Sequence, residues 1–282
     1  MFLTYVVLLI LQLPRLASTI KGKPALLVID PFIDFLHHPL LQLCEERGIH
    51  VLDAVSGYTN AILSNVGDDL PRNVVPSGNN CDEISAWARS LGDIPYQLSC
   101  VLSESDVGIS AAERIVEACN LKGNKFSPHL RSKYEVNEAC RAAGLKVVSQ
   151  LLTDDWDRAS EFVDSLLTKT EDDGDQNKND GNEAKDMGWC IVKPYRGVAS
   201  DGVFLCDSSE QAKFSFEKLK DANTYGGGTN EKVLIQEFAD GIEYAMDTVS
   251  MDGEVKVLAL WKYCKVSYVC VHVYIFACIH SL

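Results

Sequence analysis

The chain has 282 residues, which is enough for one or two domains that bury a core without disulfides or a structural metal. Its net charge of −14 argues against a nucleic acid or an anionic membrane as the partner, because both require a positive face. A composition of 46% hydrophobic and 23% charged residues excludes a wholly disordered chain. The 10 cysteines include no C-x-x-C pair, which favours reduced thiols over a disulfide framework or a zinc site.

Residues 2–13 form an apolar run, FLTYVVLLILQL, that is shorter than the roughly 20 residues of a membrane-spanning helix. Ala17 and Ser18 are small, as at a secretory cleavage site, but no Lys or Arg precedes the run. Residues 1–22 therefore have two interpretations. They are a signal or anchor in the first, and a mis-assigned start or an extra buried element in the second. We expect a cytoplasmic protein, with the secretory route or an anchor through residues 1–22 as the alternative.

The next part of the chain alternates strand-like and helix-like segments. PALLVID at 24–30 is a continuous apolar run, as expected of a strand that is buried on both faces. The predicted strands and helices alternate at 24–30, 40–47, 49–55, 97–102 and 110–121. This order is typical of a small doubly wound α/β domain with a parallel sheet, which we place at residues 23–125.

The pattern changes to α+β in residues 126–263. Helices are predicted at 132–143, 156–167 and 208–221, and strands at 147–152, 189–194, 203–206 and 233–238. A hairpin is expected around Asp252-Gly253, because this dipeptide favours tight turns. The acidic stretch 171–186 holds no large apolar side chain, so we expect a solvated insertion. A metal-binding loop is the alternative, although the spacing fits no calcium-loop pattern.

The last segment, residues 264–282, is atypical and apolar. After Lys265 it contains no Asp, Glu, Lys or Arg. A pair of strands and a short membrane segment are two interpretations. A third is that this tail replaces the sequence that the preceding domain needs there.

A lysine and a small-residue loop form the first candidate site. Lys193 ends a predicted strand directly before a loop that contains Gly197, Ser200 and Gly202. The loop can offer backbone N–H groups to phosphate while the ammonium group neutralises charge. The loop matches neither a Walker A motif nor a dinucleotide fingerprint, and Asp201 would repel phosphate unless it faces solvent or a metal.

Two further elements extend this site. The segment Gln236, Glu237, Phe238 and Ala239 leaves a predicted strand, and its backbone could bind an adenine edge, while Glu243 could accept hydrogen bonds from ribose hydroxyls. Lys133 stands at a helix start, where a positive charge is unfavourable for the helix dipole unless an anion binds there.

Three ordered phrases carry a resemblance to a known family. They are RSKY at 131–134 with RAAGL at 141–145, IVKP at 191–194 with SDGV at 200–203, and QEFADGIEY at 236–244. In this order and spacing the chain resembles the ATP-grasp superfamily, and within it the amino-acid and dipeptide ligases. Residues 23–125 then resemble the Rossmann-like domain that precedes the ATP-grasp domain, and residues 126–263 an incomplete ATP-grasp domain.

The resemblance implies an ATP-dependent carboxylate–amine ligase that acts through an acyl phosphate. Lys133 and Lys193 would contact ATP phosphates, the 197–202 loop would close over them, and Gln236 with the backbone of Glu237–Ala239 would bind adenine. Glu243 would hold the ribose, and Mg²⁺ would bridge the phosphates. A small carboxylate or amino acid would be the substrate, with Glu104 or Asp106 as candidates to meet its ammonium group.

The chain departs from the family pattern at its end. The family places its magnesium carboxylates and an arginine for the acyl phosphate after the segment Trp261–Tyr263, and this chain has none there. We therefore interpret the chain as truncated or replaced at its C-terminus. A non-catalytic nucleotide-binding protein, or an inactive form without the magnesium site, is the alternative function.

Overall fold

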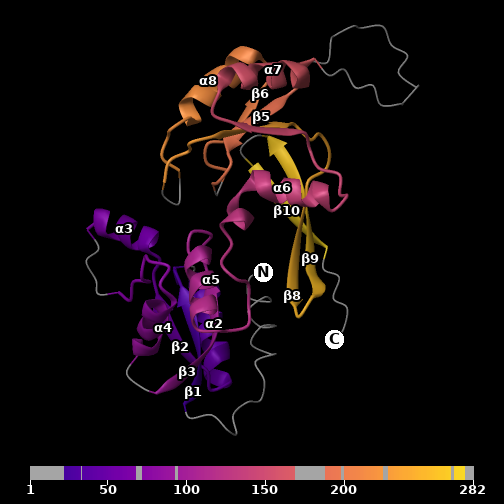
Figure 1. Ribbon diagram of the computed structural model, residues 1–282. Coiled ribbons are helices and arrows are strands. Elements are labelled where there is room, and N and C mark those ends of the chain that lie inside the picture. Colours follow the sequence, from indigo (N-terminus) through magenta and orange to yellow (C-terminus); the bar gives the residue numbers. More distant parts are fainter. Residues whose placement is uncertain are drawn as a thin grey trace. The chain divides into compact units, whose positions relative to one another are not determined.

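The computed structural model describes residues 22–32, 34–67, 72–92, 95–168, 188–197, 200–224, 228–267 and 270–276 (Figure 1). The apolar run at 2–13, the acidic stretch at 171–186 and the end of the tail at 277–282 lie outside these residues. The chain divides into two compact units. One comprises residues 127–240, and the other comprises residues 1–126 with 241–282.

The N-terminal part contains a three-stranded parallel sheet with the strand order β2-β1-β3. Its strands are β1 (Lys23–Ile29), β2 (His50–Ala54) and β3 (Tyr96–Ser103). Its helices are α2 (Asp34–Glu46), α3 (Gly57–Asn65), α4 (Cys81–Ser90) and α5 (Ile109–Ala118). The predicted parallel α/β fold of this part is confirmed, since both parallel pairings join strands that are separated by helices.

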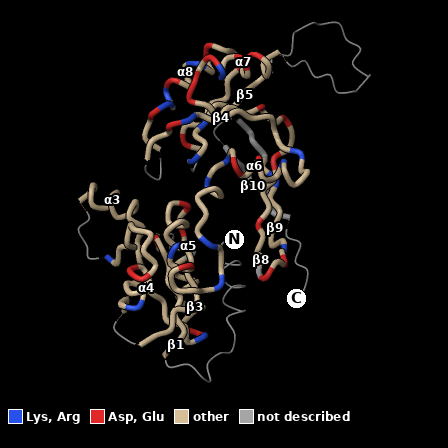
Figure 2. Tube along the Cα trace, in the orientation of Figure 1, with Lys and Arg blue, Asp and Glu red and all other residues tan. Residues whose placement is uncertain are grey.

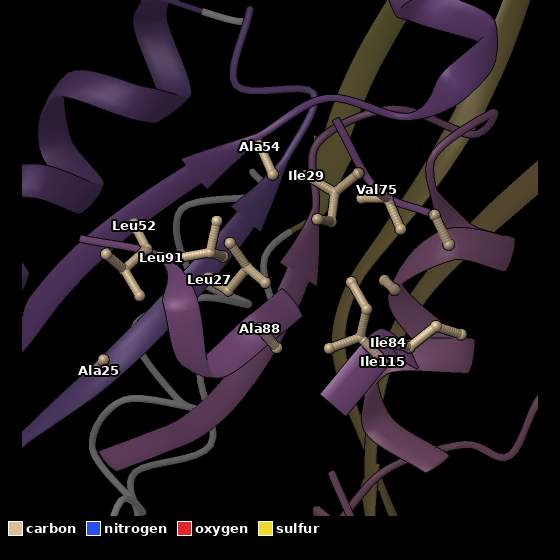
Figure 3. Packing of buried hydrophobic residues seen from close by; sticks show 12 residues of the cluster. Ala25, Leu27, Ile29, Leu52, Ala54, Val75, Ile84, Ala88, Leu91 and Ile115 are labelled. Atoms are coloured by element: carbon tan, nitrogen blue, oxygen red, sulfur yellow. The ribbon is translucent and has the colours of Figure 1, made fainter. Parts of the chain in front are cut away.

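The two faces of β1 are buried in two different cores. Ala25, Leu27 and Ile29 pack with residues of α4 and α5, and Figure 3 shows this cluster. Leu26 and Val28 pack against α2 and β3 on the opposite face. Side chains alternate along a strand, so the continuous apolar run of β1 is explained by helices on both faces of the sheet.

The second unit contains a four-stranded antiparallel sheet with the order β4-β7-β5-β6. Its strands are β4 (Gln150–Thr153), β5 (Cys190–Pro194), β6 (Phe204–Cys206) and β7 (Val233–Glu237). Its helices are the 3₁₀ helix η1 (Pro128–Arg131), α6 (Lys133–Ala142), α7 (Trp156–Leu167) and α8 (Ser209–Leu219). Helices α7 and α8 bury one face of this sheet, with Val163 and Phe216 in the shared core.

A third sheet follows, with strands β8 (Tyr244–Met251), β9 (Glu254–Ser267) and β10 (Cys270–Phe276) in antiparallel order β10-β9-β8. Asp252 and Gly253 join β8 to β9 with positive φ angles of 51° and 86°, as expected of a tight hairpin turn. In the tail, the backbone of β10 pairs with β9, which agrees with the strand-pair interpretation.

The structure also contains elements that the sequence analysis did not predict, namely α3, α4 and η1. Helix α4 carried a readable signal, because Asn80 caps it and acidic residues Asp82 and Glu83 occupy its first turn. Among the described residues, no helix has the length and hydrophobicity needed to cross a membrane. Lys and Arg positions are scattered among acidic positions in both units (Figure 2).

Candidate functional site

Strand β5 carries Lys193 on the sheet face opposite to α7 and α8. Cys190 and Val192 lie in the core beneath these helices, and alternation places Lys193 on the other face. Lys193 is directly opposite Leu234 of β7, so it shares its face with Gln236, two residues further along β7. The face that α7 and α8 leave uncovered therefore bears both residues.

Lys133 is joined to the loop after β5 by two hydrogen bonds. It is the first residue of α6, whose N-cap Ser132 accepts a hydrogen bond from the backbone N–H of Glu135. The Lys133 backbone N–H donates to the Tyr195 carbonyl at 2.8 Å, and its ammonium group donates to the Gly197 carbonyl at 2.5 Å. The start of α6 is thus anchored at the predicted phosphate loop.

The two predicted lysines lie close enough to influence each other. Burial lowers the pKa of Lys193, and the positive charge of Lys133 lowers it further. Two half-buried ammonium groups repel each other, and a bound polyanion would remove that repulsion. This part of the site can therefore attract phosphate groups.

The loop between β5 and β6 is described at both ends, and residues 198–199 lie outside the described residues. Gly202 has φ +67°, and a Cβ atom there would lie 2.9 Å from a Leu219 methyl carbon and 3.1 Å from Pro194 Cγ. A larger residue at this position would be strained in its backbone and crowded by Leu219 and Pro194. Ser200 also has a positive φ of 59°, and Asp201 is exposed to solvent, as the phosphate interpretation required of it.

The end of β7 holds the predicted adenine segment. Gln236 is 5% exposed, and its side-chain amide donates to Gln150 Oε1 at 2.8 Å. The Glu237 backbone N–H donates to the Ser149 carbonyl at 2.9 Å, so it is already used within the sheet. Phe238 and Ala239 are exposed as the chain leaves the strand.

Gln150 is a site residue that the sequence analysis missed. Its amide nitrogen donates to the Tyr134 carbonyl at 2.9 Å and to Glu138 Oε1 at 2.7 Å, and its oxygen accepts from Asn137 at 3.1 Å. Hydrogen bonds from Arg141 and Gln150 lower the pKa of Glu138. This network links α6, which begins at Lys133, to β4 and β7. No local pattern around Gln150 indicated it.

Glu243 belongs to the other compact unit, among residues 241–282. Its side chain is exposed, and its carbonyl accepts a hydrogen bond from the Tyr263 N–H at 2.9 Å. Its role in ribose binding stays a prediction.

The carboxyl edge of the parallel sheet carries a separate polar cluster. Glu104 follows β3 with 5% of its surface exposed, and its carboxylate lies 3.1 Å from His37 Nδ1 of α2. Asp53 of β2 lies 3.6 Å from the other His37 nitrogen; burial raises the pKa of Asp53, and His37 partly offsets this. Glu104 therefore faces a histidine within its own unit, whereas Asp106 is exposed.

Magnesium needs several oxygen ligands, most often carboxylates. Within the part of the chain that the structure describes, no group of three or more His, Cys, Asp or Glu residues could hold a metal ion. The described residues therefore do not fit a magnesium site.

Comparison with known proteins places this arrangement in context. No family model matches the chain. Dapdiamide A synthase of Enterobacter agglomerans is 26% identical over 255 residues, a match that covers 87% of this chain and 53% of that protein. The chain thus spans about half the length of this curated relative.

Two solved structures illustrate the similarity in fold. An L-amino acid ligase from Bacillus licheniformis matches with a TM-score of 0.53 at 15% identity, covering 87% of this chain and 51% of that one. The ATP-grasp ligase PsnB, complexed with a minimal precursor, matches with a TM-score of 0.50 at 16% identity, covering 93% and 78%.

Proposed function

We propose that this chain binds ATP and acts as a carboxylate–amine ligase. It has the ATP-grasp fold, and its predicted similarity to the ATP-grasp superfamily is confirmed. The proposed substrates are a small carboxylate, such as an amino acid, and an amine. The observation that carries the proposal is the pair of ammonium groups of Lys133 and Lys193, gathered beside the 197–202 loop.

The chemistry follows from this charge distribution. Lys133 and Lys193 bind the phosphate oxygens of ATP, and the loop backbone supplies N–H donors around them. The substrate carboxylate attacks the γ-phosphorus, ADP leaves, and an acyl phosphate forms. The amine then attacks the acyl carbon, inorganic phosphate leaves and the amine nitrogen loses a proton. The protein's contribution is to position the groups and to stabilise the negative charge of the phosphates.

The remaining predicted residues complete this proposal. Gln236 and the exposed segment Phe238–Ala239 form the adenine side, and Glu243 binds the ribose. Glu104 is the candidate for the ammonium group of an amino-acid substrate, reached only if its contact with His37 is exchanged.

A second function, nucleotide binding without catalysis, is favoured by a specific observation. The described residues assemble no metal site, and the sequence has no acidic residue after Lys265. A chain with the lysine pair alone would hold a nucleotide without transferring its phosphate.

ATP binding is tested by calorimetry on the full chain and on Lys133→Ala and Lys193→Ala variants. Hydrogen bonds to charged groups contribute about 1.5–3 kcal/mol, so each variant should bind ATP about 10- to 100-fold more weakly. Lys213→Ala is the matched control, since this lysine is exposed on α8 of the same unit. A Lys193→Ala variant that binds ATP as tightly as the parent chain would falsify the site.

Turnover separates the two functions. A ligase should release ADP and phosphate only when both an amino acid and an amine are present, and hydroxylamine should trap the acyl phosphate as a hydroxamate. ATP binding without either product supports the non-catalytic alternative.

A further inference from the structure

Two buried cysteines face each other on the antiparallel strands β5 and β6. Cys190 and Cys206 are directly opposed in the strand register and are 0% and 1% exposed. Opposed residues of antiparallel strands have Cα atoms about 4.5 or 5.5 Å apart, depending on the kind of pair. Both separations lie inside the range of about 4.4–6.8 Å that a disulfide spans. The backbone is therefore already placed for a covalent bond.

The two thiols also interact in their reduced state. The interaction between the two opposed thiols lowers the pKa of Cys206 and raises that of Cys190. Ser215 Oγ lies 3.7 Å from Cys206 Sγ and stabilises the thiolate further, while burial and Asp207 oppose it. Cys206 is thus the nucleophile of the pair and Cys190 the partner that resolves it.

A surface hollow lies beside Cys206. Cys206 lies on β6, the edge strand of the sheet, and lines this hollow of about 350 Å³ together with Gln211, Phe214 and Ser215. A water-sized oxidant can reach the sulfur from this hollow when the edge strand opens locally.

A second pair of buried cysteines provides an internal contrast. Cys44 of α2 and Cys100 of β3 pack in one core of the parallel sheet. Burial raises the pKa of both thiols to about 11, and the Cys100 thiol donates its hydrogen bond to the Val101 carbonyl at 3.8 Å. These thiols stay protonated at neutral pH and react slowly.

We propose that Cys190 and Cys206 are a modification site that hydrogen peroxide converts to a disulfide. The Cys206 thiolate attacks one peroxide oxygen, the O–O bond breaks, and water leaves once the departing oxygen is protonated, which gives a sulfenic acid. The Cys190 sulfur then attacks the Cys206 sulfur and the second water leaves. With hydrogen peroxide, two thiols and one peroxide give one disulfide and two waters.

The disulfide would close the segment 190–206 at its base. This segment contains Lys193 and the 197–202 loop, so oxidation would restrict the hairpin that carries them. The disulfide does not depend on the proposed function, whereas a fall in ATP affinity on oxidation does. A disulfide that forms without any change in ATP affinity would therefore contradict the proposed function and leave the disulfide proposal intact.

The test is differential alkylation of the full chain after reduction with dithiothreitol and brief exposure to hydrogen peroxide at neutral pH. We expect a pair of peptides linked through Cys190 and Cys206, with a mass two hydrogens lower than the sum of the two reduced peptides. Dithiothreitol should restore the two reduced peptides. The free thiol of Cys206 should disappear at least about tenfold faster than that of Cys44 or Cys100 in the same sample, because a larger fraction of Cys206 is thiolate.

Two variants sharpen the result. In Cys190→Ala, dimedone should label Cys206 as a sulfenic acid, and in Cys206→Ala, Cys190 should remain reduced. The proposal is overturned if Cys190 and Cys206 stay alkylatable in the unmutated chain while Cys44 and Cys100 oxidise, or if Cys206 instead links to the exposed Cys81 of another molecule. The measurement on the unmutated chain decides even if a variant fails to fold.

Discussion

The parallel sheet β2-β1-β3 and the antiparallel sheet β4-β7-β5-β6 differ in how their faces are used. Helices cover both faces of the parallel sheet, and Ala25–Ile29 of β1 are at most 1% exposed. The antiparallel sheet has a helical layer of α7 and α8 on one face, while Lys193 and Gln236 lie on the other. The apolar core residues of a strand contribute only stability, whereas a polar residue on the face opposite to the helices, such as Lys193, can also contact a ligand.

This contrast predicts that the largest loss of stability comes from the parallel sheet. Leu27→Ala should lower the free energy of unfolding by about 2–5 kcal/mol, because Leu27 is fully buried and truncation leaves a cavity. Urea unfolding measures the change, and ATP affinity should be unaltered. Leu41→Ala on the exposed face of α2 is the control. A loss below about 1 kcal/mol for Leu27→Ala would contradict the packing.

Neighbouring residues of β5 test the two faces of one strand. Val192→Ala removes two methyl groups from the core beneath α7 and α8 and should cost about 2 kcal/mol of stability while ATP binding is retained. Lys193→Ala should have the opposite profile, with weaker ATP binding and little loss of stability. Chemical unfolding and calorimetry on both variants give the comparison. If both variants lost stability and ATP affinity to a similar extent, the two faces of β5 would not differ in function.

The hydrogen-bond network on the polar face should have a smaller effect. Gln150→Ala leaves the buried Gln236 amide without its acceptor and should cost about 1–2 kcal/mol. Because Gln150 also holds α6 through Tyr134 and Glu138, ATP affinity should fall in the same variant. Gln97→Ala, an exposed strand residue of β3, is the control. If both the stability and the ATP affinity of Gln150→Ala were unchanged, the network would not hold α6 or Gln236 in place.

The smallest predicted effect concerns Lys193 and pH. Its pKa is lower in the folded state than in the unfolded chain, so the unfolded state binds more protons as the pH rises through that interval. The contribution of Lys193 to the free energy of unfolding is therefore lowest at a pH below its folded-state pKa. It rises with pH until the pH passes the ordinary pKa of lysine. Lys193→Met should raise the free energy of unfolding at pH 7 by about 0.5 kcal/mol. The expected gain is small because solvent screens the charge.

Urea unfolding at pH 7 and pH 10 checks this prediction. The gain from Lys193→Met should be larger at pH 7 than at pH 10, and Lys213→Met on exposed α8 should show no such difference. A destabilised Lys193→Met variant at pH 7 would mean that the ammonium group is paired rather than repelled.

Local patterns predicted much of the fold, and the reason is visible in particular elements. The run at 24–30, the helical stripe at 156–167 and the Asp252-Gly253 turn each depend on residues a few positions apart. Helix α3 was missed because it has no buried residue and hence no apolar stripe. Lys133, Lys193 and the glycine loop could be selected from their positions next to predicted element ends.

The sequence by itself determined most of the strands and helices, with α3, α4 and η1 as the exceptions, because backbone preference and the spacing of apolar residues are local properties. Only the tertiary structure decided that Lys133 meets Gly197, that Gln150 meets Gln236, and that Cys190 faces Cys206. Each of these contacts depends on the register between strands or on where a helix packs. Register is set by the cooperative burial of a whole sheet face, and no single stretch of sequence encodes it.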